Sequence, residues 1–272
     1  MTTTRRRPRV SLFAFVLMII TVIGLALLVL PVIAMVWRAI DARAALDNPR
    51  ARDILQDALV LSATTSVVSL AIIMVVGTPI AYTLARARFR GAKIIDALID
   101  LPIILPPAVA GIALLMAFGR RGVLGPTLED MGVSVGFTMS AVVIAQVFVA
   151  APFYIRTARA GFLRVDRTLE EAAADLGATP MRTFFRVTLP MARGSLLAGG
   201  ILAWARALGE FGATIMFAGN RQGVTQTMPL AIYERFSAGD LNAALVLSAV
   251  LLAMSVTFLV IVRVIGEESS PR

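Results

Sequence analysis

The sequence contains no cysteine and no histidine among its 272 residues. This absence excludes disulfides, thiolate or imidazole metal ligands, cysteine or histidine nucleophiles and a Ser–His–Asp triad. The phosphate-binding pattern GxxxxGKS or GxxxxGKT is missing too, so we do not expect the chain to hydrolyse ATP. We therefore expect neither an enzyme nor a bound cofactor or metal ion.

Charged residues are scarce as well. They make up 16% of the chain against 58% hydrophobic residues, whereas soluble domains average about 25% charged and 45–50% apolar residues. A helix needs about 20 apolar residues to cross a bilayer, and six stretches meet this need. Five of them contain no Asp, Glu, Lys or Arg, and the sixth contains only Arg206 and Glu210 as charged residues. The stretches are residues 10–37, 58–85, 101–119, 131–155 (with its helix starting near residue 137), 194–220 and 241–262.

These stretches predict an all-α integral membrane protein with six transmembrane helices. The first is longer than the apolar region of a signal peptide, which runs about 7–15 residues, so we expect it to be retained. With the N-terminus in the cytoplasm, the cytoplasmic segments hold 17 of the 26 Lys and Arg residues and the external segments hold 8. Both termini are therefore predicted inside, N-in/C-in. Because the basic residues lie at membrane edges beside lipid, we expect no nucleic-acid partner.

The long cytoplasmic loop before the fifth span carries the clearest local signals. Thr168 and Glu171 have the spacing of a capping box, and Gly177 is typical of a helix end. These signals predict a short helix over residues 169–176. Thr179 followed by Pro180 predicts the start of a second short helix.

The first of these short helices is too short to be stable alone in water. Glu170, Glu171 and Asp175 are the charged side chains expected on its solvated face. The alanines at 172–174 leave a thin surface that another protein can approach closely. The helix therefore either docks into a groove on a partner or lies on the membrane surface.

The same loop resembles the signature of bacterial ABC importer permeases, which is Glu-Ala-Ala, three residues, Gly, nine residues, Ile or Val, one residue and Leu-Pro. The matching residues are Glu171, Ala172, Ala173, Gly177, Val187, Leu189 and Pro190. The resemblance implies a short cytoplasmic coupling helix between helices 4 and 5 that fits a groove on a separate ABC ATPase subunit. It also implies a bacterial inner-membrane location and a homodimer.

The resemblance covers about residues 58–265, which implies an ABC transporter type-1 transmembrane permease core. Residues 1–57 then comprise the basic N-terminus, the first transmembrane helix and the first external loop. Residues 266–272 form a cytoplasmic tail.

A second resemblance begins within the fifth span. Residues 207–214 (ALGEFGAT), 217–220 (FAGN) and 221–233 (RQGVTQTMPLAIY) look like the molybdate permeases, whereas sulfate permeases carry related but different residues. The likeness implies a subunit that passes molybdate or tungstate inward by alternating access, with an extracytoplasmic molybdate-binding protein as a further partner. A sulfate-type ABC permease and an ATPase-independent secondary carrier are the alternatives.

Arg206 and Glu210 form an ionisable pair inside a predicted span, and their i, i+4 spacing puts both on one helix face. Charged side chains in a membrane usually face protein or a water-filled path. The pair is therefore either a gate on the pathway or a contact that fixes helix packing, and Gly212 and Thr214 leave the same choice. Prolines near the cytoplasmic edges of two spans mark either the pathway or a harmless helix entry. They are Pro102, Pro106, Pro107 and Pro190.

Overall fold

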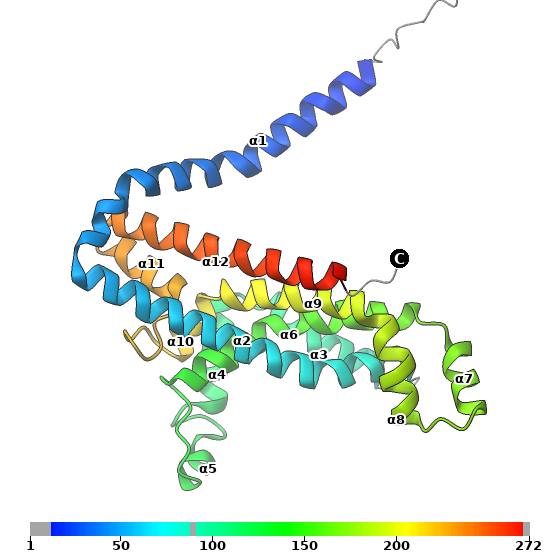
Figure 1. Cartoon of the computed structure of the whole chain (residues 1–272). Helices are drawn as coiled ribbons and strands as arrows, with labels where there is room; N and C mark the ends of the chain where they lie inside the picture. Colours follow the sequence, from blue (N-terminus) through cyan, green and yellow to red (C-terminus); the bar gives the residue numbers. More distant parts are fainter. Residues whose placement is uncertain (1–11, 88–90, 269–272) are drawn as a thin grey trace, which may run out of the picture.

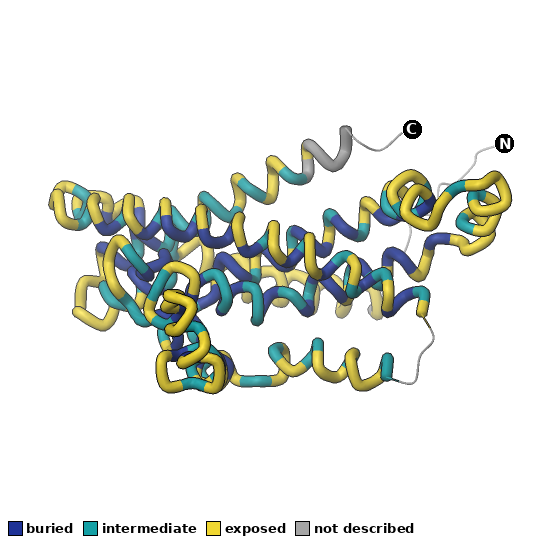
Figure 2. The backbone as a smooth tube through the Cα atoms, turned by 90° about the horizontal axis from the view of Figure 1, so that it is seen from below, coloured by how far each residue is buried: buried dark blue, intermediate teal, exposed yellow. Residues whose placement is uncertain are grey.

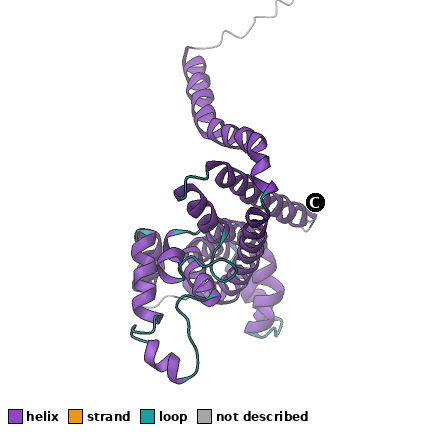
Figure 3. Cartoon of the chain, turned by 90° about the vertical axis from the view of Figure 1, so that its left-hand side faces the viewer, coloured by secondary structure: helices purple, strands orange, loops and turns teal. Residues whose placement is uncertain are grey.

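The computed structural model describes residues 12–87 and 91–268. Every regular element in this described part is a helix (Figure 3). The long helices are α1 (Leu12–Asp41), α2 (Pro49–Arg86), α6 (Met139–Arg164), α9 (Leu189–Leu208) and α12 (Leu241–Glu268). The shorter ones are η1 (Ala42–Asp47), α3 (Ala92–Ile104), α4 (Pro107–Phe118), α5 (Gly125–Asp130), α7 (Arg167–Asp175), α8 (Pro180–Thr183), η2 (Phe184–Thr188), α10 (Gly212–Phe217) and α11 (Met228–Ser237).

Within the described residues, four helices are long and apolar enough to cross a membrane, or five if a bent pair counts as one span. The four are α1 with η1, α2, α6 and the first part of α12. The prediction of an all-helical membrane protein is confirmed. The predicted third and fifth spans, however, are each interrupted.

The third predicted span, residues 101–119, is not one helix. The chain bends by 116° between α3 and α4. Leu105 is extended, with ψ at 133°, because a residue followed by proline avoids the helical region. Helix α4 then begins at Pro107, with Pro106 as its N-cap, and proline at a helix start needs no hydrogen-bond partner for its nitrogen.

The fifth predicted span, residues 194–220, is also interrupted. Helix α9 starts earlier than predicted, at Leu189, and ends at Leu208, and α10 begins only at Gly212. Helix α9 is not among the helices long and apolar enough to cross alone, and it carries Arg193 and Arg206 along its 20 residues. The near absence of charged residues in 194–220 predicted one continuous helix, and this prediction is wrong because the backbone is interrupted between Leu208 and Gly212.

Helices α2, α9 and α12 run along the length of the bundle (Figure 1). Helices α7 and α8 lie at the same end as the C-terminal part of α12, and α10 and α11 lie at the opposite end. Helix α1 leaves the bundle and contacts it mainly near the start of α12 and at η1. Its apolar residues are exposed, as expected of a helix that faces lipid or another subunit. Figure 2 shows that the buried residues gather along the packed helices of the bundle and that exposed residues dominate at its ends.

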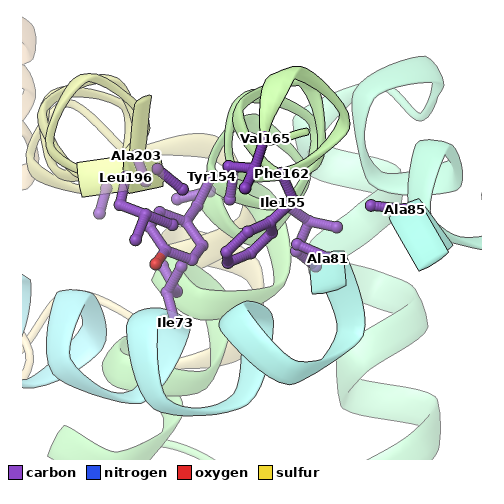
Figure 4. Packing of buried hydrophobic residues seen from close by; sticks show 13 residues of the cluster. Ile73, Ala81, Ala85, Tyr154, Ile155, Phe162, Val165, Leu196 and Ala203 are labelled. Carbon is purple, nitrogen blue, oxygen red and sulfur yellow. The ribbon is translucent and has the colours of Figure 1, made fainter. Parts of the chain in front are cut away.

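The main core lies between α2, α6 and α9. Figure 4 shows side chains of the three helices pointing toward one another, with Tyr154 and Phe162 of α6 among the fully buried ones. Gly77 and Gly199 face Tyr154, and a Cβ at Gly77 would lie 2.8 Å from its ring. The Tyr154 hydroxyl lies 2.6 Å from Thr78 Oγ1. Small residues therefore let these helices approach closely, as is common in membranes.

A buried polar seam follows one face of α2. Ser62, Thr65, Ser66 and Ser69 are all at most 1% exposed, and their i, i+3, i+4 and i+7 spacing lines them up. Their partners come from α6, α9 and the start of α11. Ser69 Oγ donates to Gln146 Oε1 at 2.9 Å, Trp204 Nε1 donates to Ser66 Oγ at 3.1 Å, and the Met228 backbone N–H donates to Ser62 Oγ at 2.7 Å. The seam pins α2 to three other elements by hydrogen bonds.

Candidate coupling site and translocation pathway

The predicted coupling helix is α7, and its N-terminus differs from the prediction. The helix begins at Arg167, and Asp166 is its N-cap, whose side chain accepts a hydrogen bond from the Thr168 backbone N–H at 3.0 Å. The predicted capping box of Thr168 and Glu171 is therefore wrong by two residues, because a carboxylate already stands at the preferred position. Hydrogen bonds from the backbone N–H and the side chain of Thr168 lower the pKa of Asp166 below its ordinary value.

The C-terminus of α7 agrees with the prediction. Gly177 has a φ of +83°, a conformation that costs a side-chain-bearing residue about 1–2 kcal/mol. The Gly177 N–H donates to Ala174 O at 2.8 Å and the Ala178 N–H to Ala173 O at 2.9 Å. A Cβ added at Gly177 would meet no described atom within 4 Å. The backbone conformation, and not crowding, therefore requires glycine here.

The signature residues of α7 are open to solvent. Glu171 and Ala172 are exposed and Ala173 is half-buried, and none of the nine described residues of α7 is buried. Leu176, at the end of the helix, is 90% exposed. The face that carries the signature is thus free to contact another protein.

Glu170 behaves differently from the prediction. It was expected on the solvated face, but its side chain is only 17% exposed and forms an ion pair with Arg86 at 2.8 Å. Thr188 Oγ1 donates to the same carboxylate oxygen at 2.7 Å. No sequence signal joins positions 86 and 170, because a contact across 84 residues depends on how α2 and α7 are placed.

Leu189 and Pro190 are not part of α7 but begin α9, directly after η2. Thr179 caps α8 by accepting from the Arg182 N–H at 3.3 Å, as predicted. Residues Phe184–Thr188 form a π turn, in which the Leu189 N–H bonds Phe184 O. Pro190 follows at the start of α9, where its missing N–H requires no partner. Leu189 and Pro190 line a groove of about 870 Å³ between α2 and α9.

Arg206 and Glu210 do form the predicted pair, with Arg206 Nη1 2.6 Å from Glu210 Oε2. They do not share a helix, however, because α9 ends at Leu208 and Glu210 lies in the break before α10. The Glu210 side chain is 1% exposed and that of Arg206 is 29% exposed. Glu210 Oε1 also accepts the Ala213 backbone N–H at 2.7 Å. Glu210 therefore balances the arginine and caps the start of α10.

The two interrupted spans meet at their breaks. A Cβ at Gly212 would lie 2.5 Å from Pro107 Cβ, and a Cβ at Gly111 would lie 2.6 Å from Ala213 O. Gly212 therefore serves close packing of α10 on α4. Thr214 is fully buried, and its Oγ1 finds no hydrogen-bond partner in the described residues. Paired interruptions of hydrophobic segments often mark a transport site in membrane proteins.

The loop that follows α10 is held by Glu234 of α11. Its Oε2 accepts hydrogen bonds from Asn220 Nδ2 at 2.9 Å and from Gln226 Nε2 at 2.5 Å. The Arg221 N–H donates to Thr225 Oγ1 at 3.0 Å. Side chains from the run that resembles molybdate permeases thus fix the shape of this loop.

Solved structures with the same arrangement of helices are membrane transporters. A bacterial ABC transporter involved in the import of the acidic polysaccharide alginate superposes with a TM-score of 0.72, and the match covers 94% of both chains at 17% identity. The two chains therefore share a fold.

Sequence comparison identifies the family. Residues 77–268 match the binding-protein-dependent transport system inner membrane component, and the chain belongs to this family. It is 45% identical over 201 residues to the molybdenum transport system permease protein ModB of Mycobacterium tuberculosis, covering 74% of this chain and 75% of that one. It is 36% identical over 234 residues to a probable sulfate transport system permease protein of Chlorokybus atmophyticus, covering 86% and 82%. The chain is thus an inner-membrane transport subunit, as the loop signature predicted.

Proposed function

We propose that this chain is the membrane-spanning permease subunit of an ATP-driven importer of molybdate or tungstate. The observation that carries the proposal is the 45% identity to a molybdenum permease over three-quarters of both chains, against 36% to a probable sulfate permease. An extracytoplasmic binding protein delivers the oxyanion, and a separate ATPase supplies the energy. The permease provides the route and moves by alternating access.

Coupling to the ATPase occurs through α7. Glu171, Ala172, Ala173 and Gly177 form the docking surface, and the exposure of Glu171 and Ala172 at one end of the molecule supports this role. Leu189 and Pro190, at the start of α9, belong to the link between this surface and the membrane helices. In this proposal the end that holds α7 faces the cytoplasm, and both termini lie inside.

Six crossings follow if α3 with α4 and α9 with α10 each cross as one interrupted span. The permease core then comprises residues 58–265, after the N-terminal region 1–57 and before the tail 266–272. Two copies pair as a homodimer and the oxyanion passes between them. Arg206, Glu210, Gly212 and Thr214 lie at the interruption of one span and are the candidate gate of that path.

The test is ATP-dependent molybdate uptake into proteoliposomes that contain this chain, its ATPase and its binding protein, with tungstate and sulfate as competitors. Vesicles without the ATPase are the control. We expect uptake only with ATP and ATPase, inhibited by tungstate and not by sulfate. Inhibition by sulfate would indicate a sulfate-type permease, and uptake without ATP would indicate a secondary carrier.

A further inference from the structure

Helix α7 is attached to the bundle by few contacts. It packs mainly on α8 and on the π turn η2, and none of its nine described residues is buried. A helix of nine residues without a buried face is marginal by itself. Whatever fixes its position must therefore come from specific polar contacts.

One such contact joins Arg167 Nη2 of α7 to Arg86 O at 3.2 Å, and the others converge on one carboxylate oxygen. Glu170 Oε1 accepts from Arg86 Nη2 at 2.8 Å, from Arg86 Nε at 3.2 Å and from Thr188 Oγ1 at 2.7 Å. Arg86 Nη2 also donates to Val165 O at 3.0 Å. Arg86 is the last residue of α2, and Thr188 directly precedes α9. One side chain of α7 is thus tied to two long helices of the core.

The clamp is shielded from water. The side chains of Arg86 and Glu170 are 13% and 17% exposed, and Thr188 is fully buried. A pair shielded in this way is screened less by salt than a surface ion pair, and removing one partner leaves a poorly solvated charge. The neighbouring Glu171 is exposed and remains available to a partner.

We infer that Arg86, Glu170 and Thr188 form a positioning clamp that transmits movement of α7 to α2 and α9. The inference rests on the proposed function, since it assumes that an ATPase moves α7. Helix α9 ends beside the Arg206–Glu210 pair, so a displacement at Thr188 reaches the candidate gate along one helix. Glu171 and its neighbours contact the ATPase, whereas Glu170 acts through the clamp.

The experiment uses the complete transporter in proteoliposomes and measures molybdate uptake and ATP hydrolysis in the same vesicles. The variants are Glu170→Gln, Arg86→Met and the two combined. Asp175→Asn is the matched control, because it makes the same charge change on α7 at an exposed residue that has no ion pair with any described residue. Copurification of the ATPase shows whether the complex still assembles.

We expect each single variant to raise the ATP consumed per molybdate on the order of tenfold, which is a common size for coupling between sites. The combined variant should be no worse than the worse single one, because the two residues act as a pair. The control should stay within about twofold of the parent, as changes at exposed, uninvolved positions usually do.

Thr188 gives a second test that leaves the charges intact. Thr188→Val removes the hydroxyl and should raise the ATP consumed per molybdate, whereas Thr188→Ser keeps the hydroxyl and should behave like the parent. A parental ratio in both Glu170→Gln and Thr188→Val, beside a Gly177→Pro variant that uncouples, would overturn the clamp and leave the proposed function standing. A parent protein without ATP-dependent uptake would overturn both.

Discussion

Two arginine–glutamate pairs stand at opposite ends of α9, and they differ in what they join. Arg86 and Glu170 link elements 84 residues apart, just before α9 begins. Arg206 and Glu210 are four residues apart, and the same glutamate caps the next helix. The first pair can carry movement between helices, whereas the second stabilises a local break. In our proposal, therefore, similar chemistry transmits movement at one end of α9 and holds the break beside the candidate gate at the other.

The largest expected effect comes from removing one partner of the Arg206–Glu210 pair. Glu210→Leu leaves Arg206 without its partner and removes the acceptor of the Ala213 N–H. Removing one member of a buried pair typically costs about 3–5 kcal/mol. We expect a strongly lowered unfolding temperature in detergent and poor yield. An unchanged unfolding temperature would show that the pair contributes little to the fold.

Removing both charges sharpens the comparison. In the Arg206→Leu/Glu210→Leu double variant no unpaired charge remains, and replacing a buried pair by apolar residues is often neutral. If the pair only shapes the break, the protein should insert normally and retain uptake. Normal insertion with lost uptake would favour the gate role, and this is the outcome that uptake assays on the reconstituted complex would detect.

Two glycines distinguish the stability of the fold, which depends on Gly212, from coupling to the ATPase, which we propose depends on Gly177. A Cβ at Gly212 would lie 2.5 Å from Pro107 Cβ, so Gly212→Ala overpacks the contact of the two breaks, at about 1–3 kcal/mol. Gly177 has open space around it but a φ of +83°, so Gly177→Ala strains only the end of α7. We expect Gly212→Ala to lower the unfolding temperature, and Gly177→Ala to raise the ATP consumed per molybdate at an unchanged unfolding temperature. The reverse pattern would contradict both assignments.

The smallest expected effect concerns the cap of α7. Asp166→Ala should lower the local stability of α7, because the helix loses its N-cap, and this is seen as faster hydrogen exchange of the α7 amides. Glu171→Ala, which removes the acceptor of the predicted capping box, should leave exchange unchanged. Because the pKa of Asp166 is lowered, its cap is complete above the ordinary value of 3.8 and is lost only as the pH falls through the lower folded value. Equal exchange in both variants would show that Asp166 is not the cap.

Sequence reasoning went furthest where the information is local. The helix end at Gly177, the second short helix at Thr179 and the Arg206–Glu210 contact all follow from spacings of a few residues. Asp166 could have been recognised too, since a carboxylate directly before a helix is a common N-cap. Glu170 was misplaced because its partners, Arg86 and Thr188, come from other parts of the chain.

The membrane spans show a further limit. An apolar run predicts that a segment is covered by lipid or protein, but it does not predict whether its backbone is continuous. Residues 101–119 were predicted as one span, and the bend lies before Pro106, where the following proline disfavours the helical conformation of Leu105. The break at Gly209–Phe211 could not be predicted from the sequence, because its residues are compatible with a helix. The break depends on the packing of Gly212 against Pro107 and on the bonds of Glu210 to Arg206 and Ala213.

The polar seam of α2 has a consequence for biogenesis. Helix α2 leaves the ribosome well before Gln146 and Trp204, which supply partners for Ser69 and Ser66. During synthesis, therefore, the hydroxyls of α2 enter the bilayer before these partners exist. A chain whose synthesis stops before α6 would expose these hydroxyls, without their partners from α6 and α9, to lipid, chaperones or proteases. The polar residues of α2 that stabilise the complete bundle would thus lack these partners in an incomplete chain.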